Sequence, residues 1–407
     1  MTDTVKNIIS HYQKALLIKP DSAVIHNELG KLYTFQGKFE NTSYHCIQAI
    51  QFAPGYFQAY WNLKFALLGL SWHGNKIATE LLDQGIEILR SAAQNQPDFP
   101  FAHAVLGDLL TQKGSKQEAI DCYQIASRNQ LLLTRPELTR QSHNLNQKSQ
   151  PGFLILGFMR CGTTSLYDYL ITHPQVLPAI DKELWFFTHF FDQGIDWYLA
   201  HFSSLANGTN YLTGEASPMY INFPDAATRV LELFPAMKFI VLLRNPVERA
   251  ISAIYLNRPP GLKNKSLERD IIDGLKKAES IVGSFTDDYL IRPPFVMNFD
   301  LDYPSLLAFS HILNSLYILY LKKWLAVFPE DQFLILKSED LFQTPATTMS
   351  KVHSFLKLPD YQLSQYRNSN PGTYPSISTS LRRRLVEFYQ PYNHQLEEYL
   401  DMKFKWE

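Results

Sequence analysis

One stretch of the sequence decides the fold of the larger part of the chain: Phe153-Leu-Ile-Leu-Gly-Phe-Met-Arg-Cys-Gly-Thr-Thr-Ser-Leu-Tyr167. It opens with an uninterrupted apolar run, passes through a loop with two glycines, and leads into residues with helical spacing. This order predicts a buried strand, a tight loop and the start of a helix. The backbone N–H groups of such a loop converge, and the helix N-terminus adds positive potential. The sequence therefore predicts an anion-binding loop between Gly157 and Thr164.

The loop differs from the nucleoside-triphosphate loop GxxxxGK[ST] at one position. Gly157 and Gly162 fit both glycines, but Thr163 stands where the lysine is expected. In kinases and ATPases that lysine reaches the phosphates beside a magnesium ion, whereas the cation of this loop is Arg160. An ATP-dependent phosphotransferase is an alternative that Thr163 argues against, and the prediction includes no metal ion.

A second anion-binding pattern follows a later apolar run. Beyond residue 150, short apolar runs alternate with helical patterns, as in a parallel sheet covered by helices. After the run Lys238-Phe-Ile-Val-Leu-Leu243 come Arg244 and, eight residues later, Ser252, with Pro246 suited to the first turn of a helix. A guanidinium group at a strand end and a hydroxyl further along the next helix can hold one phosphate from two sides. Because open α/β sheets bind ligands outside the carboxyl ends of their strands, the two anion sites are expected to converge.

The two patterns together resemble the cofactor site of sulfotransferases that use 3′-phosphoadenosine 5′-phosphosulfate (PAPS). The loop G-x-x-[K/R]-x-G-T-T is similar to the family's 5′-phosphosulfate loop, and Arg244 with Ser252 is similar to its 3′-phosphate site. The resemblance covers about residues 152–407 and implies an α/β sulfotransferase fold, a P-loop-like parallel sheet flanked by helices. It also implies PAPS as cofactor and 3′,5′-adenosine bisphosphate (PAP) as product. The implied cofactor-binding residues are Arg160, Cys161, Gly162, Thr163, Thr164, Arg244 and Ser252.

A segment between the two patterns extends the resemblance to the chemistry. Residues 213–220, Thr-Gly-Glu-Ala-Ser-Pro-Met-Tyr, are similar to the segment G-E-K-[ST]-P-x-Y of heparan-sulfate and bacterial sulfotransferases, whose glutamate acts as the catalytic base. This implies that Glu215 removes the proton of the acceptor hydroxyl, that Arg160 stabilises the leaving oxygen and that Lys182 assists. The family's lysine after the glutamate is Ala216 here. A helix-capping carboxylate is the structural alternative for Glu215.

Residues 182–187, Lys-Glu-Leu-Trp-Phe-Phe, are similar to the family stretch K-E-x-H-F-F. Trp185 replaces the histidine, which argues against a histidine base at that position and favours Glu215. His189 lies nearby and is the next candidate base, although a lone histidine is more often structural.

Two features of the C-terminal part bear on contacts with the cofactor. Arg382, Arg383 and Arg384 are positioned to reach its phosphates, but a solvated helix face is the favoured interpretation. A loop with lysine and glycine, which some relatives place near the cofactor, is not evident in residues 368–374.

The first third of the chain has the period of tetratricopeptide repeats. Ala15 and Ala49, and likewise Pro20 and Pro54, are 34 residues apart. About three and a half repeats would bury a continuous core and offer a concave groove. A plain helical bundle with accidental periodicity is the alternative. The predicted parts are an all-α tetratricopeptide repeat domain over residues 1–133, a polar linker over 134–150 and a sulfotransferase domain over 151–407.

Composition and charge argue against several other classes. The 38 basic and 39 acidic residues nearly cancel, which gives no support for a nucleic-acid partner. Cys46, Cys122 and Cys161 have neither metal-ligand spacing nor an even count, so a reducing, cytoplasmic compartment is expected. The N-terminus lacks the pattern of a signal peptide. The apolar stretch from Leu306 to Phe328 contains polar residues and predicts one amphipathic helix, not a membrane span.

The predicted function is therefore transfer of a sulfuryl group from PAPS to an acceptor hydroxyl in a soluble protein. A carbohydrate hydroxyl is favoured by residues 215–218, a peptide tyrosine is suggested by Arg160 in place of lysine, and a lipid or polyketide hydroxyl is the third candidate. The repeats are expected to dock the substrate or a protein partner. The alternative is a non-catalytic adaptor that only holds nucleotide, which the presence of Glu215, Arg244 and Ser252 argues against.

Overall fold

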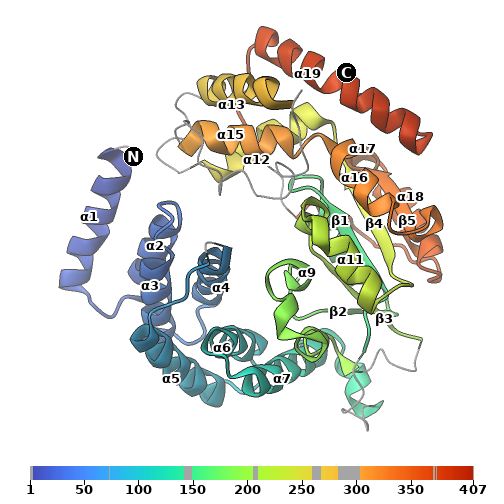
Figure 1. The fold of residues 1–407 in the computed structure, drawn as a ribbon. Helices are drawn as coiled ribbons and strands as arrows, with labels where there is room; N and C mark the ends of the chain where they lie inside the picture. Colours follow the sequence, from blue (N-terminus) through green and yellow to red (C-terminus); the bar gives the residue numbers. More distant parts are fainter. Residues whose placement is uncertain are drawn as a thin grey trace. The chain divides into compact units, whose positions relative to one another are not determined.

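The computed structural model describes residues 3–72, 74–141, 149–204, 210–258, 267–282, 303–369, 372 and 374–406. Of the predicted linker, residues 142–148 lie outside this description. The chain divides into two compact units (Figure 1). Unit 1 comprises Met1–Gln150, Leu177–Asp181 and His189–Tyr211, and unit 2 comprises Pro151–Val176, Lys182–Thr188 and Leu212–Glu407. Two segments that follow residue 150 in the sequence thus belong to unit 1.

Unit 1 begins with an all-helical array, which confirms the helical N-terminal region. Its helices are α1 (Asp3–Ile18), α2 (Ala23–Thr34), α3 (Phe39–Phe52), α4 (Phe57–Trp72), α5 (Thr79–Asn95), α6 (Pro100–Lys113) and α7 (Lys116–Thr134). Local signals set their ends. The Ser22 hydroxyl accepts a hydrogen bond from the backbone N–H of Ile25 at the start of α2. Gly114, at φ 86°, ends α6 in the left-handed conformation that glycine adopts most easily.

Small residues let paired helices of the array approach closely. A Cβ atom on Gly30 of α2 would lie 3.0 Å from the Cys46 sulfur of α3, and one on Gly107 of α6 would lie 2.7 Å from the Tyr123 ring of α7. A larger residue at Gly107 would force the Tyr123 ring to move, and one at Gly30 would make a tighter contact than packed side chains usually do.

A lysine between two aspartates lies at the centre of unit 1. The Lys64 ammonium group of α4 forms an ion pair with Asp181 and lies 3.6 Å from an Asp108 carboxylate oxygen of α6. Tyr123 donates a 2.8 Å hydrogen bond to Asp108. Burial alone would lower the pKa of Lys64, but the two carboxylate charges outweigh it and raise that pKa. Lys64 therefore stays charged and ties Leu177–Asp181 to the array.

The second added segment also packs on the array through aromatic residues. It contains the helical turns η2 (Phe191–Gln193) and α10 (Ile195–Leu199). The Trp197 indole donates a 2.9 Å hydrogen bond to the Thr111 hydroxyl, and its ring meets Tyr123 edge-on at 5.3 Å between centroids. The His201 ring lies 4.0 Å from that of Tyr123. Part of the array's surface is thus covered by the chain's own segment.

A five-stranded sheet has the order β2-β3-β1-β4-β5, and unit 2 contains all of its strands except the last two residues of β2. The strands are β1 (Phe153–Gly157), β2 (Val176–Pro178), β3 (Leu212–Ala216), β4 (Lys238–Leu243) and β5 (Phe333–Lys337). The pairs β1·β3, β1·β4 and β4·β5 are parallel. Because β1 and β4 are nearly continuous runs of buried apolar residues, they fit the centre of a sheet covered on both faces.

Helices flank the sheet, as Figure 1 shows, and this confirms the predicted α/β fold. Apart from α10, the α-helices that follow β1 in the described residues are α8 (Thr163–Leu170), α9 (Phe186–His189), α11 (Pro224–Leu233), α12 (Pro246–Asn257), α13 (Leu267–Val282), α15 (Tyr303–Leu313), α16 (Tyr317–Leu325), α17 (Ser338–Gln343), α18 (Pro345–Phe355) and α19 (Thr379–Leu400). Buried residues of α12, α13, α15 and α19 form one apolar core with Ile251, Ile271, Phe309 and Leu385.

The prediction of one helix from Leu306 to Phe328 is wrong, because α15 and α16 are separate helices. The break lies at Ser315, whose hydroxyl accepts a 2.7 Å hydrogen bond from the buried Arg249 guanidinium. The same hydroxyl donates to the Pro246 carbonyl oxygen at 3.2 Å, so Ser315 is bonded to the start of α12 just after α15 has ended. No helix among the described ranges is long and apolar enough to cross a membrane.

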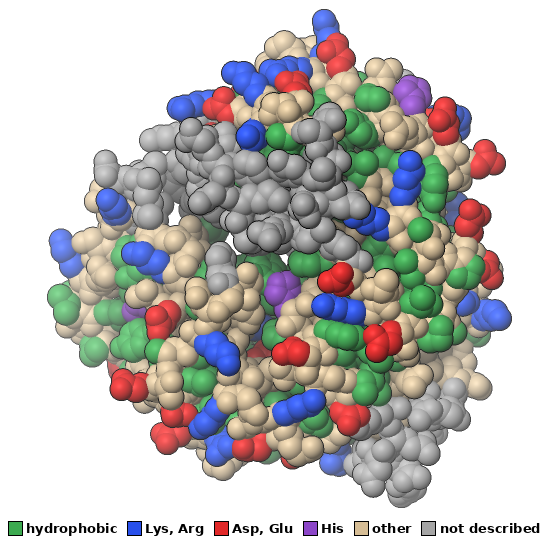
Figure 2. Space-filling model, viewed as in Figure 1, with side chains coloured by type: hydrophobic (Ala, Val, Ile, Leu, Met, Phe, Trp, Pro, Cys, Tyr) green, Lys and Arg blue, Asp and Glu red, His purple; other side chains and the backbone are tan. Residues whose placement is uncertain are grey.

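Among the described residues on the face of the molecule in Figure 2, charged side chains of both signs are interspersed. This distribution agrees with the formal net charge of −1.

Candidate functional site

The predicted anion-binding loop connects β1 to α8 with the expected strand–loop–helix geometry. Gly157 has φ 141°, and a Cβ atom there would lie 2.8 Å from the Leu242 carbonyl oxygen of β4. Gly162, at φ 91°, precedes the first residue of α8, Thr163. Arg160 has φ 74°, which is uncommon for a residue other than glycine and marks a strained position. The loop is therefore fixed by local constraints that few other residues would satisfy.

Three predicted site residues from separate elements meet at this loop. The Arg160 guanidinium donates a 2.9 Å hydrogen bond to the Ser252 hydroxyl of α12. Arg244, which follows β4, donates a 3.0 Å hydrogen bond to the Arg160 carbonyl oxygen. The parallel pairing of β1 with β4 places both strand ends together. The structure thus brings Arg160, Arg244 and Ser252 into one group.

The turn after β4 determines where Ser252 lies. The Asn245 side chain accepts hydrogen bonds from the backbone N–H groups of Val247 and Glu248, at 3.0 and 3.3 Å, and so caps the start of α12. Pro246 occupies the first turn, where its missing N–H costs nothing. These two residues fix the helix start that directs Ser252 toward Arg160.

The two arginines make this site electrostatically suited to an anion. Burial and the nearby charge of Arg244 both lower the pKa of Arg160. An anion bound between the two guanidinium groups would relieve their repulsion and accept charge-assisted hydrogen bonds. The geometry therefore favours a phosphate-like or sulfate-like ligand.

The remaining loop residues contribute mainly through their backbone. The Cys161 side chain is fully buried, and burial raises the pKa of its thiol. Its carbonyl oxygen accepts a 2.6 Å hydrogen bond from Ser338 at the start of α17. Thr163 is buried, whereas Thr164 is partly exposed in the first turn of α8. The buried Cys161 side chain and its hydrogen-bonded carbonyl group thus hold the loop in place.

Glu215 of β3 is fully buried and accepts hydrogen bonds on both carboxylate oxygens. One oxygen accepts from the backbone N–H of Leu184, at 3.2 Å, and from the Ser217 hydroxyl. The other accepts from the Tyr220 hydroxyl at 3.0 Å. Burial and the charge of Glu215 raise the pKa of Tyr220 well above its ordinary value. The described contacts of Glu215 thus join residues 184 and 215–220 into one buried network.

Lys182 and Glu183 lie at the more exposed edge of the same network. Their side chains form an ion pair, with exposed fractions of 18% and 36%. The Lys182 carbonyl oxygen accepts a 3.1 Å hydrogen bond from the backbone N–H of Ala216. Trp185 has φ 57°, a strained conformation for so large a residue. The sequence did not single out Glu183, because a motif does not show which of the two carboxylates, Glu183 or Glu215, is exposed.

His189, the last residue of α9, packs against an aromatic ring of the helical array. It belongs to unit 1, where its ring lies 5.8 Å from that of Trp72. This packing fits the structural role that is usual for a lone histidine.

The segment after α18 contacts α8 through residues 368 and 369. The sequence did not predict this contact. The Ser165 hydroxyl of α8 donates to the Asn368 side chain at 3.3 Å and accepts from the backbone N–H of Ser369 at 3.0 Å. A Cβ atom on Gly372 would lie 2.7 Å from an Arg160 guanidinium nitrogen. Although no lysine- and glycine-containing motif is evident there, the backbone of Gly372 lies beside the loop. Residues 370, 371 and 373 lie outside the described residues.

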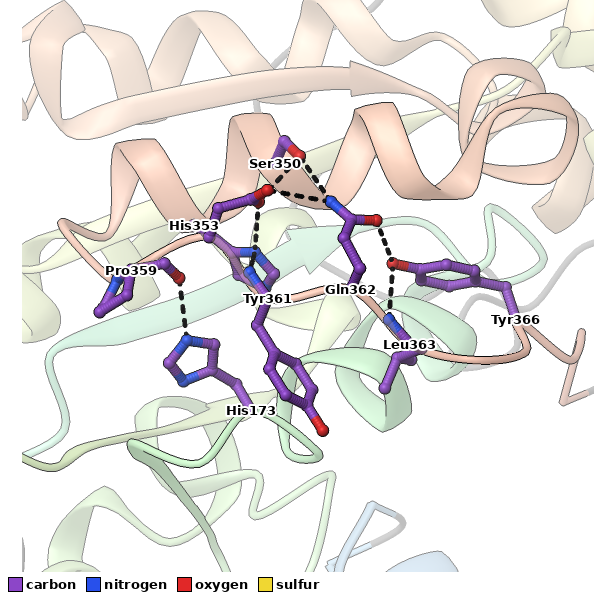
Figure 3. A network of polar contacts seen from close by, with 9 residues as sticks. His173, Ser350, His353, Pro359, Tyr361, Gln362, Leu363 and Tyr366 are labelled. Atoms are coloured by element: carbon purple, nitrogen blue, oxygen red, sulfur yellow. Dashed lines mark hydrogen bonds and ion pairs between the residues drawn. The ribbon is translucent and has the colours of Figure 1, made fainter.

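A polar network anchors the beginning of this segment (Figure 3). The His173 ring, which follows α8, lies within 3.0 Å of the Pro359 carbonyl oxygen. Asp360 accepts a 2.8 Å hydrogen bond from Ser350 of α18 and lies 3.4 Å from the His353 ring. The segment is thus fixed before it reaches the loop.

One of the three C-terminal arginines turns toward the site rather than toward solvent alone. Arg382 of α19 forms an ion pair with Glu248 of α12, whereas Arg384 pairs with Glu279 of α13. Glu248 also accepts a hydrogen bond from Tyr374, to which Arg244 donates. The Arg382 side chain is 42% exposed, so it lies on a solvated helix face and also belongs to this ion-paired group.

A family model described as the sulfotransferase domain matches residues 150–370, more than half of the 407-residue chain. The chain belongs to the sulfotransferase family. The match begins just before β1 and includes the loop, Glu215, Arg244 and Ser252 of this sulfotransferase.

Curated relatives of this sulfotransferase include membrane-associated sulfotransferase kil1 of Dictyostelium discoideum, 27% identical over 313 residues, with 63% of this chain and 66% of the relative covered. Human heparan sulfate glucosamine 3-O-sulfotransferase 6 is 28% identical over 283 residues, with 63% and 73% covered. The chain thus matches just under two thirds of the length of kil1. Among solved structures, a sulfotransferase from Alicyclobacillus acidocaldarius matches with TM-score 0.47 and 23% identity, over 63% of this chain and 98% of that chain.

Proposed function

We propose that this sulfotransferase transfers a sulfuryl group from PAPS to a carbohydrate hydroxyl and releases PAP. The observation that carries the proposal is the meeting of Arg160, Arg244 and Ser252 beside the loop between β1 and α8. Two adjacent guanidinium groups and a glycine-containing loop suit a nucleotide with phosphate or sulfate groups at two positions.

In this proposal the two anion-binding patterns of the sequence hold different parts of the nucleotide. The loop from Gly157 to Thr164 holds the 5′-phosphosulfate, and Arg160 stabilises the charge that develops on the leaving oxygen. Arg244 and Ser252 hold the 3′-phosphate. ATP fits this arrangement less well, because it lacks a 3′-phosphate and Thr163 replaces the lysine of nucleoside-triphosphate loops.

The acceptor hydroxyl must lose its proton as its oxygen attacks sulfur, while the bond between sulfur and the bridging oxygen breaks and PAP leaves. Two carboxylates compete for the role of base. Glu215 is fully buried and accepts three hydrogen bonds, from Leu184, Ser217 and Tyr220. Glu183 is about a third exposed beside Lys182. Exposure favours Glu183 as the base and Glu215 as the anchor of the segment that carries it.

A carbohydrate acceptor is supported by one named relative and by the sequence of residues 215–218. That relative acts on heparan sulfate glucosamine, as its name states. A peptide tyrosine and a lipid or polyketide hydroxyl are the alternatives that an acceptor panel must include.

The proposal assigns helices α1 to α7 to tetratricopeptide repeats, because the 34-residue period coincides with pairs of helices. In this proposal the surface of the array that α10 leaves uncovered docks the acceptor or a protein partner, and the protein works in the cytoplasm. A non-catalytic adaptor is the competing function.

The experiment combines transfer and binding. Radiolabelled PAPS is incubated with the full-length protein and a panel of polysaccharides, tyrosine peptides and lipid hydroxyls; label is expected on a polysaccharide. Arg244→Ala is expected to weaken PAP binding by about 2–3 kcal/mol, and to weaken binding of adenosine 5′-phosphosulfate, which lacks the 3′-phosphate, far less. Thermal stabilisation by ATP with magnesium but not by PAP would overturn the proposal, and PAP binding without transfer to any acceptor would favour the adaptor.

A further inference from the structure

Three side chains from distant parts of unit 2 meet beside Arg244. Glu248 lies in the first turn of α12, Tyr374 lies between α18 and α19, and Arg382 lies in the first turn of α19. The Tyr374 hydroxyl donates a hydrogen bond to one carboxylate oxygen of Glu248, and the Arg382 guanidinium contacts the other. Both oxygens of Glu248 are thus engaged by groups from outside its own helix.

This group is connected to Arg244 through the tyrosine. One guanidinium nitrogen of Arg244 donates to the Tyr374 hydroxyl at 3.4 Å, while the other donates to the Arg160 carbonyl oxygen at 3.0 Å. A planar guanidinium group held on two sides has a defined orientation. Since the Tyr374 proton is donated to Glu248, the lone pairs of its oxygen are available to Arg244. Glu248 therefore determines that Tyr374 acts as an acceptor toward Arg244.

The negative charge of Glu248 near Arg244 is offset by the positive charge of Arg382. Burial would raise the pKa of Glu248, but the hydrogen bonds from Tyr374 and Arg382 outweigh it and lower that pKa. A carboxylate alone would repel a phosphate at Arg244. Arg382 forms an ion pair with Glu248 and so offsets the negative charge near Arg244.

We propose that Glu248, Tyr374 and Arg382 are positioning residues that orient Arg244 toward the 3′-phosphate of the nucleotide. The inference rests on the proposed function, since it presumes a 3′-phosphorylated nucleotide. It assigns the C-terminal helix α19 a part in nucleotide selection. These residues act through Arg244, so their loss affects nucleotides with a 3′-phosphate and spares those without one.

The test measures the dissociation constants of PAP and AMP by calorimetry on the full chain. Tyr374→Phe removes only the hydroxyl and is expected to raise the PAP constant about two- to tenfold, the range of one hydrogen bond, with the AMP constant unchanged. Arg382→Met is expected to act in the same direction. Arg384→Met is the matched control, because this arginine lies on the same helix but pairs with the exposed Glu279. It is expected to leave both constants unchanged.

A double-mutant cycle separates positioning from general damage. In an Arg244→Ala background, Tyr374→Phe is expected to have no further effect on PAP, because the group it positions is gone. An equal effect in both backgrounds, or an equal loss of PAP and AMP affinity, would overturn the positioning role. If the unmodified protein binds AMP as tightly as PAP, the proposed 3′-phosphate site itself fails and the inference falls with it. If the unmodified protein prefers PAP and Tyr374→Phe retains that preference in full, only the inference fails.

Discussion

Lys64 of unit 1 and the pair Arg160 and Arg244 of unit 2 differ in what surrounds them. In unit 1, Lys64 lies between two carboxylates, those of Asp108 and Asp181, and its pKa is raised. In unit 2, Arg160 and Arg244 lie near each other and donate to a hydroxyl and a backbone carbonyl, and the pKa of Arg160 is lowered. Two carboxylates balance the charge of Lys64, whereas the charge of Arg244 lowers the pKa of Arg160.

The difference separates a structural role from a binding role. A buried charge with its counter-charges in place joins the elements that carry them, and removing one partner leaves the others uncompensated. Two cations held together against their repulsion are stabilised by an external anion, and perturbed groups of this kind gather at functional sites. Substitution of Lys64 should therefore affect folding, and substitution of Arg160 should affect ligand binding and turnover.

The largest expected effect on stability comes from Lys64→Met. It leaves Asp108 and Asp181 close together without their cation, and should reduce the free energy of unfolding of unit 1 by about 3 kcal/mol. Urea titration followed by tryptophan fluorescence measures the change. The triple variant that also carries Asp108→Asn and Asp181→Asn should recover part of the loss. As a control, Lys113→Met breaks an exposed ion pair with Asp83 and should cost less than about 1 kcal/mol. An equal loss for the two lysines would contradict the comparison.

Arg160→Ala should show the opposite pattern. Turnover is expected to fall about a hundredfold or more, since the guanidinium stabilises charge at the leaving oxygen, and PAP should bind more weakly. The urea midpoint should stay unchanged, because the lost Ser252 hydrogen bond is offset by relief of repulsion with Arg244. Steady-state transfer rates, PAP calorimetry and urea titration give the three readouts. A destabilised protein that retains its PAP affinity would remove the distinction between the two cation groups.

The carboxylates of Glu183 and Glu215 allow a similar distinction between a role in turnover and a role in stability. Glu183→Gln is expected to lower turnover about a hundredfold, without a change in PAP affinity or stability. Glu215→Gln should lower turnover as well, but with a loss of stability of about 1–3 kcal/mol, because its amide NH₂ would face groups that already donate. Initial rates and thermal unfolding of both variants decide between them. Near-normal turnover in Glu183→Gln, together with an inactive but stable Glu215→Gln, would return the base role to Glu215.

The smallest expected effect concerns pH and a histidine pair in unit 1. The His26 and His45 rings face each other with their Nδ1 atoms 3.0 Å apart. Burial and the charge of His26 lower the pKa of His45 from 6.5 to about 4. Because the unfolded chain binds the proton more readily, the stability from neutral His45 is present above pH 6.5 and is lost as pH falls toward 4. Urea midpoints between pH 7 and 4 should fall less steeply in His45→Gln, and parallel curves would rule this contribution out.

Features that depend on a short stretch of residues could be predicted from the sequence. The apolar run before Gly157 predicted β1, and the glycines predicted the loop, because such conformations admit few other residues. Arg244, Pro246 and Ser252 likewise lie within nine residues and one strand–helix turn, and the structure shows that turn.

The features that could not be predicted from the sequence depend on contacts between residues far apart in the chain. Lys64 and Asp181 are 117 positions apart, and Arg382 and Glu248 are 134 apart. No local pattern reports such pairs. The burial of Glu215 and the exposure of Glu183 follow from how the segment at Leu184 folds back on β3, which a motif does not encode.

The membership of Leu177–Asp181 and His189–Tyr211 in unit 1 has a consequence for inheritance. A recombination event that joined a different transferase sequence at residue 150 would supply an aspartate and a tryptophan not selected to meet Lys64 and Thr111. The helical array and these two segments therefore have to be inherited together. Fusion proteins built from this chain should exchange the array with both segments, or leave the pair intact.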